Sequence, residues 1–246
     1  MGEDVMSEKI VYVGRDLEAM SFAVNYHRWI LDVFSPWLGA RLVEVGAGTG
    51  EFSELLLARR PETISLVEPS ADMHRLLEGR VHAAGALASV ATYNATFADV
   101  AERIRAEQSP DSVIYVNVLE HVRDDEAELR AVHRTLGAGG KVFIFVPALP
   151  WLYGEFDRRV GHHRRYTKAE LEEKCRRAGF TILKSVYFDL AGIAPWWIQY
   201  RLLKAGTLRP GAVKLYDRLV VPVTRAFESL VNPPLGKNLL LIAEKT

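Results

Sequence analysis

Three glycines stand at alternate positions in the segment VEVGAGTGE. Gly46, Gly48 and Gly50 lack a Cβ atom where an apolar run changes to a helical pattern, so the backbone can approach a ligand closely and take positive φ angles. Dinucleotide-binding turns have the spacing G-x-G-x-x-G and hold a pyrophosphate, whereas the spacing here is G-x-G-x-G. Glu44 and Glu51 flank the turn, and two carboxylates would repel a pyrophosphate. The residues favour a ligand with an ammonium or sulfonium group and no phosphate.

A further acid, Glu68, ends the next apolar run of the chain. A carboxylate at this place can accept hydrogen bonds from both hydroxyls of a ribose. The alternative is that the glycines are ordinary turn residues and that Glu68 is a solvated strand end. Because these signals fall at consecutive strand ends, where open α/β sheets bind ligands, we expect a nucleoside site.

Histidines are the side chains most suited to remove a proton from an acceptor near neutral pH. The candidates are His121, His162 and His163, and Asp157 is placed to orient one of the last two. Each has a structural alternative: His121 begins a predicted helix, and the other two lie in a basic loop. The sequence therefore predicts a set of possible bases without choosing among them.

A basic and aromatic segment surrounds two of these histidines. It contains four arginines: Arg158, Arg159, Arg164 and Arg165. One interpretation is that they bind an anionic acceptor, because arginine pairs bidentately with carboxylate or phosphate. The other is that Arg164 and Arg165 pair with glutamates further along the chain: Glu170, Glu172 or Glu173. Tyr153 and Tyr166 either wall an acceptor pocket or pack the loop.

Alternating strand and helix patterns indicate the framework that positions these residues. Such alternation is typical of a parallel sheet with helices on both faces. Strands are expected at 42–45, 63–67, 89–93, 112–118, 141–146, 180–187 and 239–243. Helices are expected at 20–37, 52–60, 71–78 and 124–136, and from the capping residue Thr167 to about Gly179.

The chain divides into three predicted parts. Residues 1–37 form an N-terminal helical cap behind a loose polar lead-in over 1–16. Residues 38–188 and 236–246 form the ligand-binding domain. Residues 189–235 form a helical insertion, with a glycine-containing linker at 206–211 between two amphipathic stretches. The insertion is a lid, a homodimer surface, an interfacial membrane helix or an element packed on the sheet.

Composition limits the class of partner and compartment. Among the 246 residues, 31 basic side chains balance 31 acidic ones, and a zero net charge argues against a nucleic-acid partner. A single cysteine, Cys175, excludes an intrachain disulfide and fits the reducing cytoplasm. It has no second cysteine or histidine at ligand spacing, so no metal site is expected. No run approaches the roughly 20 apolar residues of a transmembrane helix.

These motifs resemble the class I S-adenosylmethionine-dependent methyltransferases, in particular a small-molecule branch usual in bacteria. The matching pieces are EVGAGTG at 44–50, EPS at 68–70, NVLEH at 117–121, the segment 136–140 and the dipeptide 146–147. They cover most of residues 20–187 and the last strand. The run WLYGEFDRRVGHHRRYTKAEL is similar to a segment found in uncharacterised members of that branch.

The resemblance implies a Rossmann-like, seven-stranded mixed sheet with a reversed last strand. It implies that S-adenosylmethionine lies across the strand ends and leaves as S-adenosylhomocysteine. The residues that it implies for the cofactor are Glu44, Gly46, Ala47, Gly48, Gly50, Glu68, Pro69, Ala95, Thr96, Asn117, Val118 and Leu119, with Tyr26 from the N-terminal helix.

The function expected from the sequence is methyl transfer to a small molecule, at an oxygen of an anionic or hydroxylated metabolite. The alternatives are N-methylation of a small molecule, a cofactor-binding protein without turnover, a methyltransferase of macromolecules, and a nucleotide-linked oxidoreductase. Nucleic-acid binding at low salt and titration with NAD are the measurements that test the last two.

Overall fold

The apolar runs of the sequence form one seven-stranded sheet in the computed structural model, which describes residues 23–85, 89–202 and 210–246. In chain order the strands are β1 (Arg41–Val45), β2 (Thr63–Val67), β3 (Val90–Tyr93), β4 (Ser112–Val116), β5 (Lys141–Pro147), β6 (Phe180–Phe188) and β7 (Asn238–Lys245). Their spatial order is β3-β2-β1-β4-β5-β7-β6, and β7 is antiparallel to both of its neighbours. The predicted mixed sheet with a reversed last strand is confirmed.

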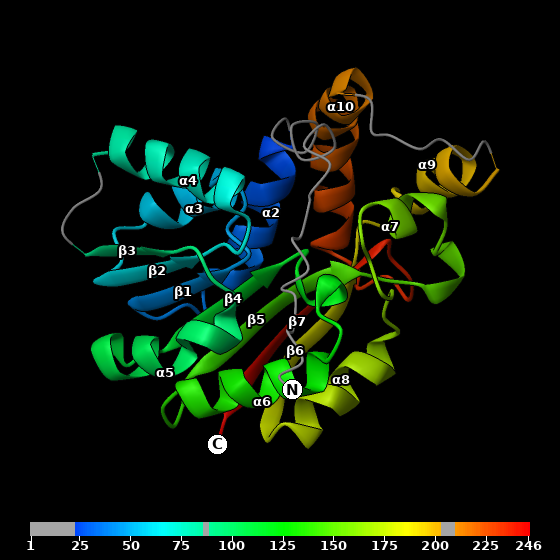
Figure 1. Cartoon of the computed structure of the whole chain (residues 1–246). Coiled ribbons are helices and arrows are strands. Elements are labelled where there is room, and N and C mark those ends of the chain that lie inside the picture. The colour runs from blue at the N-terminus through cyan, green and yellow to red at the C-terminus, as the bar shows by residue number, and fades with distance from the viewer. Residues whose placement is uncertain (1–22, 86–88, 203–209) are drawn as a thin grey trace, which may run out of the picture.

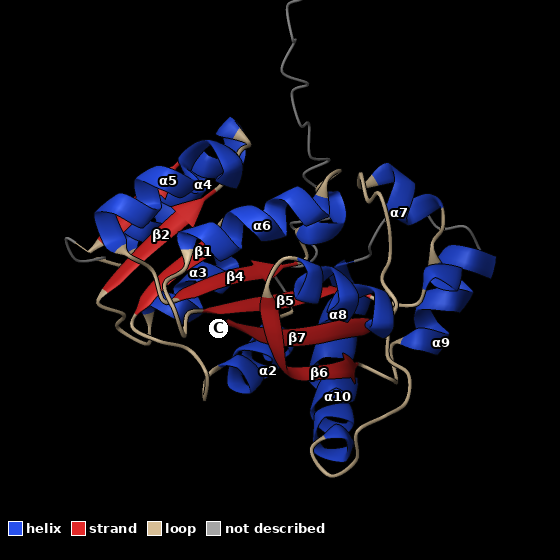
Figure 2. Ribbon diagram, turned by 90° about the horizontal axis from the view of Figure 1, so that it is seen from below, coloured by secondary structure: helices blue, strands red, loops and turns tan. Residues whose placement is uncertain are grey.

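Helices cover both faces of this sheet (Figures 1 and 2). One layer contains α2 (Val24–Phe34), α3 (Glu51–Leu57), α4 (Ala71–Ala83) and α10 (Pro210–Glu228). The opposite layer contains α5 (Phe97–Gln108), α6 (Asp125–Thr135) and α8 (Lys168–Arg177). A separate buried apolar cluster fills the space between the sheet and each layer, with Ile30 and Leu56 in one and Phe97 and Leu129 in the other.

Short helical segments connect the larger elements near the ends of β4, β5 and β6. They are the 3-10 turns η1 (Leu119–His121) and η2 (Pro150–Leu152), the short helices α7 (Glu155–Arg159) and α9 (Ile193–Trp196), and the π-helical turn η3 (Trp197–Leu202). None of the described helices is both long and apolar enough to cross a bilayer.

Several predicted boundaries differ from the observed ones. β4 ends at Val116 rather than at 118, because Asn117 takes a φ of 55° and turns the chain out of the extended conformation. Helix α5 is absent from the sequence-based prediction. The polar lead-in at 1–16, the first residues of the helix expected at 20–37 and part of the linker at 206–211 lie outside the described residues.

Helix α10 of the insertion packs against α2 and supplies its missing cap. The residue before α2, Ala23, has no side-chain oxygen for the helix start. The carboxylate of Asp217 accepts hydrogen bonds from the backbone N–H groups of Asn25 at 3.1 Å and Tyr26 at 2.8 Å. These contacts favour the packing interpretation of this part of the insertion. Another side of α10 exposes apolar residues: Leu215, Leu219, Val223 and Phe227.

Replacing Asp217 with alanine is expected to lower the free energy of unfolding by about 1–2 kcal/mol, because two N–H groups at the start of α2 lose their acceptor. Urea unfolding followed by circular dichroism measures this change. Asp72→Ala is the control, since that carboxylate is exposed in the first turn of α4. Equal effects of the two substitutions would show that Asp217 does not act as a cap.

Candidate functional site

The glycine turn lies where the strand order of the sheet reverses direction. β1 is paired with β2 on one side and with β4 on the other, and all three are parallel. Crossovers leave this point towards opposite edges, so the turns after β1 and β4 bound a crevice that open α/β sheets use for ligands. Gly46, Gly48 and Gly50 all have positive φ angles, of 69°, 58° and 95°.

Two of these glycines differ in what surrounds them. A Cβ atom on Gly46 would lie 2.4 Å from a methyl carbon of Val118, so the absence of that atom allows the turns after β1 and β4 to touch. The N–H groups of Gly46 and Ala47 donate to the carbonyl of Val67 at the end of β2. A Cβ atom on Gly48 would meet no atom within 4 Å. The space above Gly48 is therefore open for a ligand.

Glu68 is fixed to the glycine turn by its carboxylate. One oxygen accepts from the N–H of Gly48 at 2.9 Å and the other from the N–H of Ser70 at 2.8 Å. Burial raises the pKa of Glu68, and these two backbone hydrogen bonds act in the opposite direction. Each carboxylate oxygen has a second lone pair, so both can still accept from the hydroxyls of a ribose. The acceptor oxygens of Glu68 and the open space at Gly48 fit the ribose of an adenosyl group.

The end of β3 contributes two further predicted residues, Ala95 and Thr96. Thr96 begins α5, and its hydroxyl donates to the carboxylate of Asp99 at 2.6 Å. A residue that the sequence analysis missed lies beside them. The amide of Asn94 donates to the carbonyls of Glu68 at 3.0 Å and Pro69 at 3.1 Å, and thereby joins the ends of β2 and β3. A polar residue directly after a predicted strand is the signal that identifies it.

The two acids around the glycine turn are held by neighbouring side chains. Glu44 is buried and accepts a short hydrogen bond from the hydroxyl of Ser53. Burial raises the pKa of Glu44 to about 8. Glu51 pairs with Arg80 at 2.9 Å and accepts from the hydroxyl of Thr49. The charge of Glu51 is therefore directed at a cation of α4.

Residues after β4 form the other wall of the crevice. The N–H of Asn117 donates to the carbonyl of Phe145 at 2.8 Å, which fixes the turn, and Val118 contacts Gly46 as described above. The side chain of Leu119 is fully buried in the apolar core. The contact with the cofactor that the resemblance implies for Leu119 stays a prediction.

Tyr26 is also part of the core. Its ring packs edge-on against Phe145 and Phe188. Its hydroxyl is hydrogen-bonded to Asp189 and Asn238, both at 3.1 Å. The hydroxyl belongs to a buried polar network that joins α2 to the ends of β6 and β7, and the expected contact of Tyr26 with the cofactor stays a prediction.

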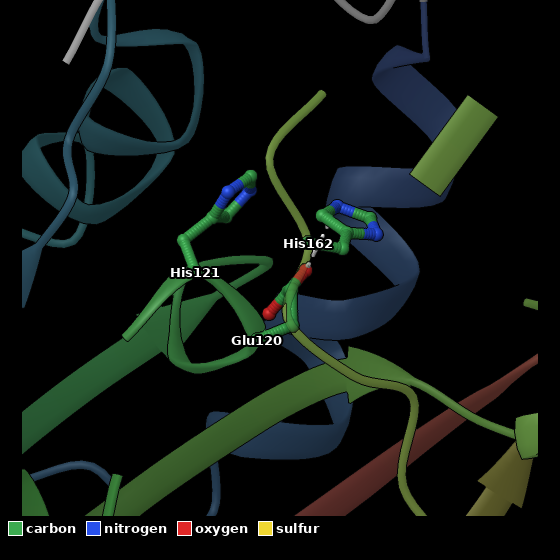
Figure 3. Close-up of side chains that lie close together, drawn as sticks. All are labelled: Glu120, His121 and His162. Carbon is green, nitrogen blue, oxygen red and sulfur yellow. Dashed lines mark ion pairs between the residues drawn. The ribbon is translucent and has the colours of Figure 1, made fainter. Parts of the chain in front are cut away.

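Three side chains with possible ligand atoms come together after β4. They are Glu120 and His121 of η1 and His162 of the loop after α7, and we call them the Glu–His cluster (Figure 3). The histidine rings contact edge-on with centroids 4.6 Å apart. Nε2 of His162 lies 3.8 Å from Oε1 of Glu120. Burial raises the pKa of Glu120 to about 7, and it lowers the pKa of His121 to about 3.

Asp157 holds His162 in place, as the sequence analysis proposed. Its carboxylate lies 2.9 Å from Nδ1 of His162 and accepts from Arg165 at 2.8 Å and from the N–H of Gly154 at 2.9 Å. Burial acts to raise the pKa of Asp157, but these partners outweigh it and the pKa is lowered. His163 is exposed, and only its backbone N–H reaches the cluster, at the carbonyl of Glu120.

The arginines expected to bind an anionic acceptor are held by internal aspartates. Arg165 is buried against Asp157, and Arg164 pairs with Asp125 at 2.7 Å. The expected pairing with the glutamates of α8 is also absent for these two arginines among the described contacts. Tyr166 is fully buried and donates to Asp125, which favours the alternative that it packs the loop.

Tyr153 is the one predicted acceptor residue that stays beside the cluster. It is half-buried, and its hydroxyl donates to the carbonyl of His162 at 2.8 Å. The tyrosine therefore helps to fix the backbone of the loop that carries the histidine.

Comparison of the sequence with known proteins gives a family match and a distant relative. A family model described as "Methyltransferase domain" matches residues 22–185. A ubiquinone biosynthesis O-methyltransferase of Paracidovorax citrulli is 25% identical over 173 residues, which are 64% of this chain and 69% of the relative.

Two solved structures share the fold at low sequence identity. A methyltransferase in complex with the Haloferax volcanii Trm112 methyltransferase activator superimposes with a TM-score of 0.63 at 14% identity, over 98% of this chain and 99% of the other. Phosphoethanolamine N-methyltransferase 2 of Haemonchus contortus, solved with S-adenosyl-L-methionine, gives 0.61 at 18% identity, over 94% of this chain and 57% of the other.

Gly48→Ala is expected to weaken binding of S-adenosylhomocysteine by at least about tenfold, because the added methyl group enters the open space above the turn. The positive φ angle should cost about 1 kcal/mol of stability. Gly46→Ala should cost about 2–4 kcal/mol, since a clash with Val118 adds to the strain. Calorimetric titration and urea unfolding measure both effects. Unchanged affinity in folded Gly48→Ala would contradict the position of the site.

Glu44 should make stability depend on pH. Its raised pKa means that the folded state holds a proton that the unfolded chain releases above about 4.5. This contribution to stability is complete below about 4.5 and disappears as the pH rises through about 8. We therefore expect the unfolding free energy of wild type, relative to that of Glu44→Gln, to decrease as the pH rises from about 5 to about 8.5. A constant difference would show that Glu44 ionises alike in both states.

Proposed function

The chain belongs to the class I S-adenosylmethionine-dependent methyltransferases, and from this premise we propose that it methylates an oxygen atom of a small hydroxylated molecule. The cofactor supplies an electrophilic methyl group on its sulfonium sulfur. The glycine turn and Glu68 would hold it, and Asn117 and Val118 would bound it from the β4 side. Pro69, Ala95 and Thr96 remain proposed neighbours of its adenine.

The observation that carries the oxygen preference is the Glu–His cluster. Two of its members, Glu120 and His121, are separated from Val118 by a single residue, and Val118 touches Gly46 of the glycine turn. A hydroxyl acceptor must lose its proton when its oxygen bonds to the methyl carbon, and a positioned imidazole or carboxylate is suited to that task. Asp157 keeps His162 turned towards Glu120. The cluster is thus a group of proton acceptors beside the proposed methyl donor.

We prefer a hydroxylated acceptor to an anionic one because two of the four arginines of this segment are engaged by aspartates within the chain. Arg164 and Arg165 are paired with aspartates of this chain, so they do not supply the binding site that an anionic group requires. The curated relative named an O-methyltransferase supports oxygen as the acceptor atom. The single cysteine is buried, which is compatible with a reaction in the reducing cytoplasm.

The test is a screen of hydroxylated metabolites with the purified chain and methyl-labelled S-adenosylmethionine. With an acceptor in hand, His162→Ala should lower kcat by about 100-fold or more while the affinity for S-adenosylhomocysteine stays unchanged. His163→Ala is the matched control from the same loop, because its side chain is exposed. Equal turnover of wild type and His162→Ala would remove the cluster from the reaction, and transfer only to amines would refute the oxygen preference.

A further inference from the structure

Glu120 is a buried carboxylate without a hydrogen-bond partner. Its residue is fully inaccessible to solvent, and neither Oε1 nor Oε2 has a donor among the described residues. Burying an unpartnered carboxylate is costly, and native structures resolve such groups with a donor, a water molecule or an ion. The nearest ionisable side-chain atom is Nε2 of His162, and their separation of 3.8 Å is too long for a hydrogen bond.

The same separation suits a metal ion between the two atoms. Bonds from a zinc-like cation to imidazole nitrogen and carboxylate oxygen measure about 2.0–2.2 Å each, so a cation bound to both atoms can span up to about 4 Å. One ligand atom from each of Glu120, His121 and His162 lies within 4.8 Å of the others. Figure 3 shows Glu120 and His162 facing each other, with His121 on the same turn as Glu120.

The second ring nitrogen of each histidine is already engaged as metal-binding histidines require. The carboxylate of Asp157 can only accept, so Nδ1 of His162 carries the proton and Nε2 presents its lone pair to the cluster. This carboxylate–histidine arrangement orients the ring and increases its basicity as a ligand. The ring of His121 is hydrogen-bonded to the backbone of Gly161. Both imidazole rings are therefore oriented by a hydrogen bond to a partner outside the cluster.

We propose that Glu120, His121 and His162 bind a divalent transition-metal ion of the first row, such as Zn²⁺, Mn²⁺ or Fe²⁺. Two imidazoles and one carboxylate favour these ions over Mg²⁺ and Ca²⁺, which prefer sites made of oxygen ligands. Three protein ligands leave positions open for a substrate, which is typical of catalytic rather than structural metal sites.

The metal also specifies how the cluster acts, and this part of the inference rests on the proposed function. The acceptor hydroxyl binds at an open position, and the cation lowers its pKa. The O–H bond breaks, the proton passes to solvent, and the oxygen keeps the electron pair. That pair then forms the bond to the methyl carbon as the C–S bond breaks, and the electrons of the C–S bond remain on sulfur. His162 is in this scheme a ligand, and Asp157 is a positioning residue.

The test measures binding of the metal itself. Tag-free full-length chain is treated with chelator, freed of it, and titrated with Co²⁺, whose visible absorption bands report nitrogen and oxygen ligands. We expect one Co²⁺ per chain, displacement by Zn²⁺ and no displacement by Mg²⁺ at the same concentration. Glu120→Gln and His121→Ala should each weaken binding by about 100-fold or more. His82→Ala, at an exposed histidine of α4, should bind as wild type does.

Each outcome decides the proposal. The proposal is overturned if neither Co²⁺ nor Zn²⁺ binds. It is also overturned if wild type and Glu120→Gln bind the metal equally. Loss of binding in His82→Ala would show an adventitious ion only. Glu120→Gln keeps the size of the side chain, and binding of S-adenosylhomocysteine checks that both variants fold. Methyl transfer that survives chelation refutes the metal and leaves the proposed function standing. Specific metal binding without methyl transfer to any hydroxylated acceptor supports the metal site and refutes the proposed function.

Discussion

The buried ion pair between Asp157 and Arg165 is the interaction on which the candidate acceptor site depends. Both side chains are almost completely inaccessible, and removing one partner of such a pair typically costs about 3–5 kcal/mol because the other charge stays buried. The same carboxylate holds His162, and the guanidinium lies over the ring of Trp196 at 4.8 Å. One pair thus joins the loop after β5 to the helical insertion and directs an imidazole at Glu120.

A second aspartate repeats this arrangement on the other side of η1. Asp125 accepts from Tyr166 and Lys174, both at 2.8 Å, and pairs with Arg164. The hydroxyl of Tyr166 also donates to the carbonyl of Leu119 within η1. The turn that carries the ligand-like side chains is therefore held from α6, α8 and the loop between β5 and α8. Preorganisation of this kind is what a catalytic group needs, because it removes the cost of ordering the group during the reaction.

The sequence identifies the glycine turn and Glu68 more directly than it identifies the long-range contacts around His162, for a physical reason. The glycine turn, Glu68 and the positions of the strands depend on local signals: apolar runs, glycines and residues at strand ends. Helix α5 was missed although half of its 12 residues are apolar and Thr96 and Asp99 form a capping pair that marks its start. The partners of Arg164 and Arg165 are not predictable from spacing, since α6 and α7 bring their aspartates close only after folding.

The same contrast explains why the sequence did not predict the grouping of Glu120 and His121 with His162. The sequence marks His121 as a candidate base after a strand. It does not show that Glu120 is buried without a partner, because that is a property of the packed molecule. The loop that carries His162 provides the third member from a distant part of the chain. The cofactor side is built from one local turn whose geometry tolerates few substitutions at Gly46. The proposed acceptor side is built from long-range polar contacts, so substitutions in its loop would leave the glycine turn unchanged.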